Sequence, residues 1–111
     1  MSFEKACSLD ELRDGEALGV TVGDQELAIA HDGDEVFAVE DICSHAAVPL
    51  SEGDVEGCTV ECWLHGSRFD LRTGKPTGLP ATEPVATFPV DVRDGDVYVD
   101  VETFLNGVTP Q

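Results

Sequence analysis

Basic residues are scarce in this chain. Only 6 of its 111 residues are Lys or Arg, whereas 23 are Asp or Glu, and the formal net charge is −17 at pH 7. So acidic a surface repels nucleic acids and anionic membranes, and we expect neither as a partner. It suits a protein partner with a basic docking face, or solvation in salt, and the composition leaves both uses open.

Long apolar runs are lacking as well. No segment reaches the length of a membrane-spanning helix, and the first residues contain no apolar stretch typical of a secretory signal. The four cysteines do not form the dense pattern of a disulfide-stabilised domain. We therefore expect a cytoplasmic protein, and the length predicts a single domain, residues 1–111, with a modest core.

Short apolar segments with an alternating pattern, separated by Gly and Asp, predict an all-β fold. Strands are expected at residues 3–7, 17–22, 26–31, 35–40, 59–62, 68–71, 86–92 and 97–101. A capping-box spacing from Ser8 to Glu11 predicts one short helical turn, and the tail from Glu102 is expected to be loosely ordered. Residues 41–84 depart from strand patterning and contain Gly and Pro, which indicates a small subdomain inserted between strands.

Two short segments carry the residues best suited to bind a metal. Cys43 and His45 lie in one segment, and Cys62 and His65 lie in the other, after the sixteen residues 46–61. Together they supply two thiolates and two imidazoles, the ligand set of a two-iron cluster with mixed ligation. Structural zinc sites usually pair Cys with Cys and His with His at gaps of two to five residues, which is not the pattern here. We favour a 2Fe-2S cluster, with a structural zinc domain as the alternative.

The residues after the second segment extend the pattern. His65 to Asp70 (HGSRFD), followed by Leu71 to Pro76 (LRTGKP), resembles the second cluster loop of Rieske-type ferredoxins, and the resemblance covers nearly the whole chain. It implies a Rieske fold: an antiparallel β-sandwich or barrel-like base, with residues 41–84 as the inserted cluster-binding subdomain.

The same resemblance implies the role of each ligand. Cys43 and Cys62 would hold one iron of a [2Fe-2S] cluster, and His45 and His65 would hold the other iron through Nδ1. One cluster is expected per chain.

Four further residues are expected beside the cluster. Gly66 permits unusual dihedral angles and a close approach of the backbone. Rieske proteins with a high reduction potential place a Ser and a Tyr hydroxyl near the cluster sulfurs. The matching residues here are Ser67 and Phe69, so the Tyr hydroxyl donor is missing. Pro80 lies in a third loop, residues 78–84, that matches the loop covering the cluster in the family.

A second difference from the high-potential Rieske proteins, besides Phe69, concerns a disulfide. The high-potential proteins carry one extra Cys in each cluster loop, and the matching positions here are Val48 and Leu64. The missing Tyr hydroxyl and the missing disulfide both point to a reduction potential in the low part of the Rieske range, which runs from roughly −150 to +300 mV.

The resemblance implies an electron carrier and not an enzyme. Such a ferredoxin passes single electrons from a flavoprotein reductase to a terminal oxygenase that acts on aromatic compounds, and we expect it to be monomeric. A Rieske ferredoxin that serves iron-sulfur cluster assembly or another reductive pathway is one alternative. A cluster-free structural subunit, like the small subunit of nitrite reductase, is another, which we disfavour because all four ligands are present.

Overall fold

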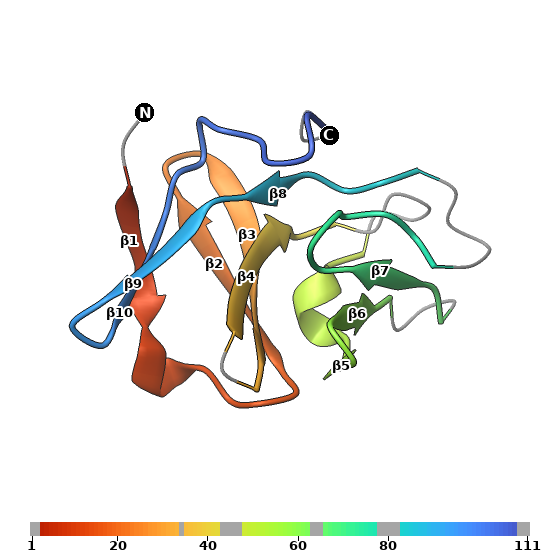
Figure 1. The fold of residues 1–111 in the computed structure, drawn as a ribbon, viewed down its shortest axis with the longest axis horizontal. Coiled ribbons are helices and arrows are strands. Elements are labelled where there is room, and N and C mark those ends of the chain that lie inside the picture. Colours follow the sequence, from red (N-terminus) through yellow and green to blue (C-terminus); the bar gives the residue numbers. More distant parts are fainter. Residues whose placement is uncertain (1–2, 34, 43–47, 63–65, 78–82, 109–111) are drawn as a thin grey trace.

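A computed structural model of the chain describes residues 3–33, 35–42, 48–62, 66–77 and 83–108. Within these ranges it contains ten β-strands and two short 3₁₀ helices (Figure 1). In chain order they are β1 (Glu4–Ser8), η1 (Leu9–Glu11), β2 (Ala17–Val22), β3 (Gln25–Asp32), β4 (Glu35–Glu40), η2 (Leu50–Glu52), β5 (Val55–Glu56), β6 (Thr59–Glu61), β7 (Arg68–Asp70), β8 (Thr87–Phe88), β9 (Val90–Arg93) and β10 (Asp96–Val99).

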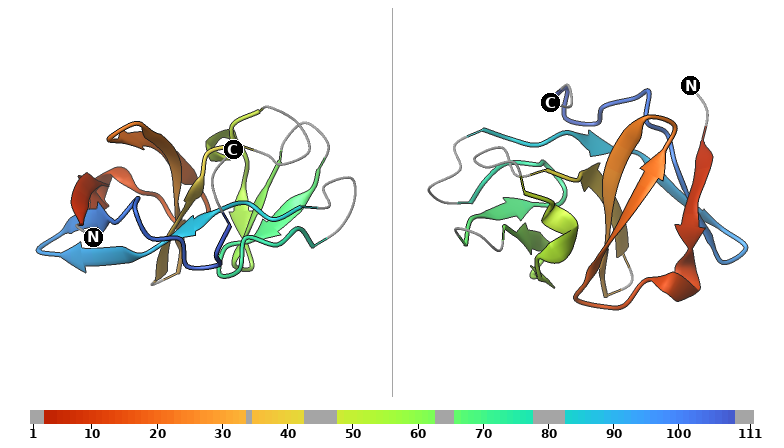
Figure 2. Two further views of the ribbon diagram at one scale, coloured as in Figure 1. Left: turned by 90° about the horizontal axis from the view of Figure 1, so that it is seen from above. Right: turned by 180° about the vertical axis from the view of Figure 1, so that it is seen from behind.

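The strands form three antiparallel sheets. Their orders are β1-β10-β9, β2-β3-β4-β8 and β5-β6-β7. The first two sheets make the base, and the third lies beside them, on the right in Figure 1. Seen from behind, the β2–β3 hairpin lies between β1 and the third sheet (Figure 2). The expected all-β fold with a sandwich-like base is confirmed.

The middle of β3, an inner strand of the four-stranded sheet, is buried on both faces, because side chains along a strand point alternately to opposite sides. On β3, Leu27 and Ile29 join the core of the base, whereas Ala28 and Ala30 join a second core shared with the third sheet. The small alanines let the third sheet pack closely against β3. One sheet therefore supports the base on one face and the smaller sheet on the other.

Proline divides the strand that the sequence predicts over residues 86–92. Pro89 has no backbone N–H to donate, and the chain changes sheets at this residue. β8 pairs with β4 before it, and β9 pairs with β10 after it. The single predicted strand is thus two short strands in two sheets.

The turn after β1 forms as the capping-box pattern predicts. The backbone N–H of Ser8 donates to Glu11 Oε2 at 2.7 Å, and η1 follows directly.

The expectation of a loosely ordered tail is wrong for residues 102–108. The ring of Phe104 packs edge-on against Phe88, with centroids 5.7 Å apart, and Leu105 N donates to Thr87 O. Val108 also contacts the core of the base. The spacing of a few isolated apolar residues in a tail does not predict that they pack against a strand distant in sequence.

None of the helices in the described ranges is long and apolar enough to span a bilayer.

Candidate metal centre

Cys62 is the predicted ligand that falls within the described residues. It directly follows β6, and its side chain has no exposed surface. It belongs to the core shared with the third sheet, where Leu50, Val60 and Phe69 are also buried. Cys43, His45 and His65 lie outside the described residues, as does Pro80.

Hydrogen bonds close the loop in which Cys62 lies. Glu61 pairs with Arg68 at the end of the β6–β7 ladder. Beyond this pair, Cys62 N donates to Ser67 O at 2.6 Å, and Gly66 N donates to Cys62 O at 2.8 Å. Gly66 has a φ of +75°, the left-handed conformation that favours glycine, as the sequence predicts. Cys62 is therefore held at the base of a tight loop that also contains position 65.

The segment that contains Cys43 and His45 is also closed at its base. The carboxylate of Asp41 accepts hydrogen bonds from the backbone N–H and the hydroxyl of Ser51, at 2.7 and 2.8 Å. Asp41 N in turn donates to Glu26 O on β3. The two ends of this segment are thus fixed to each other and to the four-stranded sheet.

Gly19 on β2 makes room for this closure. A Cβ at Gly19 would lie 2.8 Å from Ser51 Oγ and 3.1 Å from Asp41 Oδ2. Any larger residue at position 19 would displace the pair.

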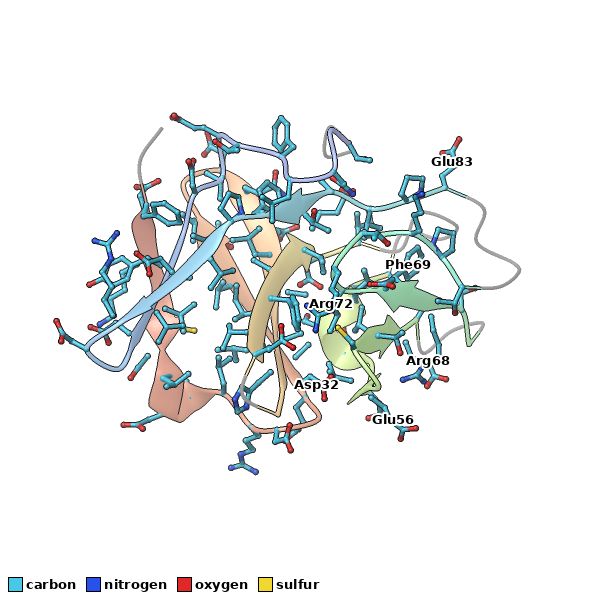
Figure 3. All side chains as sticks on the ribbon, viewed as in Figure 1. Asp32, Glu56, Arg68, Phe69, Arg72 and Glu83 are labelled. Carbon is cyan, nitrogen blue, oxygen red and sulfur yellow. The ribbon has the colours of Figure 1, made fainter. Side chains whose placement is uncertain are left out.

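The residues on either side of 78–82 return to the third sheet. Thr77 N donates to Arg68 O at 2.8 Å, and Pro76 forms a bridge with Phe69. Val85 N donates to Gly74 O at 2.8 Å. Figure 3 shows Glu83, where the described chain resumes, at the same end of the molecule as Phe69. The described flanks of all three predicted loops therefore contact the third sheet or the core beneath it.

Ser67 and Phe69 are both almost completely buried next to this loop. Phe69 pairs with Val60 across the ladder, and its ring carries no hydroxyl group. Their contact with a cluster stays a prediction, because three of the four predicted ligands lie outside the described ranges. Within those ranges, no three His, Cys, Asp or Glu side chains come together as a metal site.

A polar junction joins the third sheet to the base. Arg72 forms an ion pair with Glu35 on β4, and its guanidinium lies 5.4 Å from the centre of the Phe37 ring. Nearby, Cys58 N donates to the carboxylate of Asp32 at 2.8 Å. Figure 3 shows Asp32 and Arg72 on the side of the third sheet that faces β4.

Cys58 itself is a thiol in an unusual position. It has a φ of +62° in the turn between β5 and β6, where glycine would be unstrained. Burial raises the pKa of the thiol, while the positive charge of Arg72 opposes this rise. The described cysteines Cys7, Cys58 and Cys62 form no disulfide with one another.

Sequence reasoning did not find Asp41, Ser51 or Gly19. A lone Asp after a strand and a Ser ten residues later form no recognised short motif. The one available signal was the position of Asp41, immediately before a segment with two predicted ligands.

Comparison with known proteins extends these observations. A family model described as "Rieske [2Fe-2S] domain" matches residues 2–89. The 3-phenylpropionate/cinnamic acid dioxygenase ferredoxin subunit of Photorhabdus laumondii is 48% identical over 102 residues, which cover 91% of this chain and 96% of that protein.

Solved structures show the same similarity. The ferredoxin of carbazole 1,9a-dioxygenase from Nocardioides aromaticivorans IC177 superposes with a TM-score of 0.84 at 36% identity, covering 89% of this chain and 97% of that one. A second match, with a TM-score of 0.80 at 39% identity, comes from a complex of reduced oxygenase and oxidized ferredoxin in carbazole 1,9a-dioxygenase, and covers 87% and 91% of the two chains.

Proposed function

The chain belongs to the Rieske [2Fe-2S] domain family, and we propose that it is the ferredoxin component of an oxygenase system that acts on aromatic compounds. It is an electron carrier, not an oxygenase. The observation that carries this proposal is similarity along the whole length, because a dioxygenase ferredoxin subunit and this chain cover each other almost completely. The cofactor is one [2Fe-2S] cluster of the Rieske type.

The ligands of the cluster are Cys43, His45, Cys62 and His65. Two thiolates and two imidazoles fit the chemistry of a Rieske centre, in which Cys binds one iron and His binds the other. The complete burial of Cys62 at the base of a closed loop supports its assignment as a ligand on the protected side. When bound, the cluster accepts and releases one electron. Residues 41–84 form the cluster-binding subdomain of the single domain 1–111.

The protein around the cluster keeps its potential in the low part of the Rieske range. Phe69 offers no hydroxyl group to a sulfur atom. Val48 and Leu64 stand where the high-potential proteins have the extra cysteine of each cluster loop, so that disulfide is missing. Hydrogen bonds to sulfur stabilise the reduced cluster, so fewer donors mean a lower potential. Gly66, Ser67 and Pro80 lie in the loops that surround it.

The partners are a flavoprotein reductase, which supplies the electron, and a terminal oxygenase, which receives it. A related ferredoxin has been observed in complex with its oxygenase. The acidic surface supports docking to a basic face, because residues 14–67 contain no Lys or Arg at all. We place the protein in the cytoplasm as a monomer.

The alternative functions differ from this one in the bound cofactor or in the electron acceptor. A zinc domain and a cluster-free subunit would lack the electron-carrying cluster that the ferredoxin relatives share. A ferredoxin for cluster assembly or another reductive pathway would hold the cluster but would not reduce an oxygenase.

The decisive experiment is voltammetry of the purified, iron-replete protein between pH 6 and 10, with iron, sulfide and zinc measured on the same sample. We expect a one-electron couple in the low part of the range, which falls with pH where imidazole protons leave the oxidised form. A colourless protein that contains zinc and shows no couple would refute the ferredoxin assignment. The partners are tested by asking whether a flavoprotein reductase reduces the purified protein and whether an aromatic-ring oxygenase then oxidises it.

A further inference from the structure

A hollow lies where the base, the third sheet and the C-terminal tail meet. Its volume is about 320 Å³, at the lower end of the range for small-molecule sites. The described residues that line it come from β4, from the turn after β7, from β8 and β9, and from the tail. Seven of these nine residues are apolar, and two of the seven, Phe37 and Phe88, are aromatic. The hollow therefore suits a small, flat, apolar ligand.

The rim of the hollow is apolar as well. Leu105 in the tail is 62% exposed, more than any other large apolar residue in the described ranges. It is held in place, because Leu105 N donates to Thr87 O at 2.9 Å and the neighbouring Phe104 packs on Phe88. Folding gains little from so exposed a leucine, whereas a ligand in the hollow would cover part of it.

Charges at the hollow restrict the class of ligand. Arg72 is the one charged residue among the described lining residues (Figure 3). Its guanidinium lies 5.4 Å from the centre of the Phe37 ring, and it forms an exposed ion pair with Glu35. A planar guanidinium offers a face on which an aromatic ring stacks.

The same charges disfavour an ionised ligand of either sign. The positive charge of Arg72 repels a cation that enters the hollow. The net charge of −17, together with the carboxylates of Glu35 and Asp70 beside Arg72, repels an anion. An uncharged aromatic ring avoids both costs.

The buried end of the hollow carries a polar group without a partner. Thr87 lines the hollow and is 1% exposed, and its hydroxyl has no hydrogen-bond partner among the described residues. The backbone N–H of Thr87, by contrast, donates to Oδ1 of Asn106 in the tail at 3.3 Å. A buried hydroxyl without a partner is costly and uncommon. A hydroxyl group on the ligand would supply that partner.

We propose that this hollow binds an uncharged aromatic compound that carries a hydroxyl group, such as a phenol. The ring lies between the apolar walls and the guanidinium of Arg72, and its hydroxyl group bonds to that of Thr87. All lining residues used here belong to the described ranges, and none of them is a predicted cluster ligand. Binding therefore does not depend on the cluster.

The test is an NMR titration of the iron-replete protein with phenol, followed through the backbone amides. We expect saturable shifts at the lining residues, with a Kd on the order of 1 mM. Benzoate and benzylamine, which are charged at pH 7, should each bind about tenfold more weakly. Either of them binding as tightly as phenol would overturn the proposed class of ligand. The absence of saturable shifts up to about 20 mM phenol would overturn the site.

Two variants locate the ligand. Thr87→Val keeps the shape of the side chain and removes a hydroxyl that has no partner among the described residues, so the fold should tolerate it. It should bind phenol about tenfold more weakly and bind toluene as the wild type does. A wild-type preference for phenol over toluene in this variant would overturn the role of the hydroxyl.

Leu105→Ser removes the exposed wall and should also weaken phenol binding about tenfold. Val92→Ser is its matched control, because Val92 is 44% exposed and is not among the described lining residues. It should bind phenol as the wild type does. Equal affinities in the two serine variants would overturn the site. A wild-type protein that holds no 2Fe-2S cluster would overturn the proposed function and leave this site intact.

Discussion

The carboxylate of Asp41 holds Ser51 twice, by its backbone N–H at 2.7 Å and by its hydroxyl at 2.8 Å. The nine residues between them include Cys43 and His45. One acidic side chain thus closes the first predicted ligand segment, in the way that the hydrogen bonds of Cys62 with Ser67 and Gly66 close the second.

Replacing Asp41 with Ala should open the first segment. The variant loses two partly buried, charge-assisted hydrogen bonds, and we expect a loss of about 2–3 kcal/mol in unfolding free energy together with poor iron retention. Ser51→Ala keeps the backbone N–H bond and should lose only about 1 kcal/mol. Urea unfolding and iron content measure both effects. Equal losses in the two variants would contradict the role given to the carboxylate.

Cys62→Ser should abolish the cluster. A serine hydroxyl has nearly the same size but stays protonated, so it cannot replace a thiolate ligand. We expect no visible absorbance and little bound iron after purification. Cys58→Gly is the matched control, because glycine fits the φ of +62° at that position. It should keep the cluster and change the unfolding free energy by less than about 1 kcal/mol. An iron-sulfur spectrum in Cys62→Ser would show that this thiol is not a ligand.

Gly53→Ala should prevent folding or nearly so. A Cβ at Gly53 would lie 1.6 Å from Glu61 O, a backbone atom that cannot move without disrupting β6. Gly23→Ala is the control, because its Cβ would meet nothing within 4 Å and only the φ of +61° is unfavourable. We expect Gly23→Ala to cost about 1 kcal/mol and Gly53→Ala well over about 3 kcal/mol, measured by thermal unfolding. Similar melting temperatures would refute the close approach at Gly53.

Stability should fall as the pH rises above 9, in part because of Cys7. Burial, and then the charges of Glu11 and Asp96, raise the pKa of this thiol from 9.0 to about 11. Between these values the unfolded chain ionises its thiol while the folded protein keeps the proton. The folded state therefore binds more protons, and its contribution to stability, about 2 kcal/mol, is present below pH 9 and lost by about pH 11.

Urea unfolding midpoints from pH 8 to 11 test this dependence. Cys7→Ala should show a shallower decline than the wild type over the same range, even though its midpoint at pH 8 is lower because a buried side chain has been shortened. Parallel declines in the two proteins would exclude Cys7 as a cause.

The sequence predicted what short-range patterns encode. The bounds of β2 and β4 match the expected strands, because alternation and flanking turns mark both ends. The four predicted ligands follow from residue type and spacing; of these, Cys62 lies within the described residues and is buried, and its role as a ligand stays a prediction. The strand expected over residues 86–92 was not divided at Pro89, where the chain changes sheets.

The residues that hold the loops together were not predicted, for a physical reason. Asp41 meets Ser51, and Asn106 meets Thr73, only after the sheets have brought distant segments into contact. Nothing in the local sequence of either residue distinguishes it from an ordinary polar surface residue. Long-range hydrogen bonds of this kind depend on the finished fold.

The burial of β3 on both faces has a consequence for the rate of electron transfer. Since β3 supplies Ile29 to one core and Ala28 to the other, the third sheet cannot shift without disturbing the packing of the base. A frame that keeps its geometry when the charge of its centre changes has a small nuclear reorganisation energy. An electron can then be transferred with little thermal activation, and the difference in potential between electron donor and acceptor need not be large.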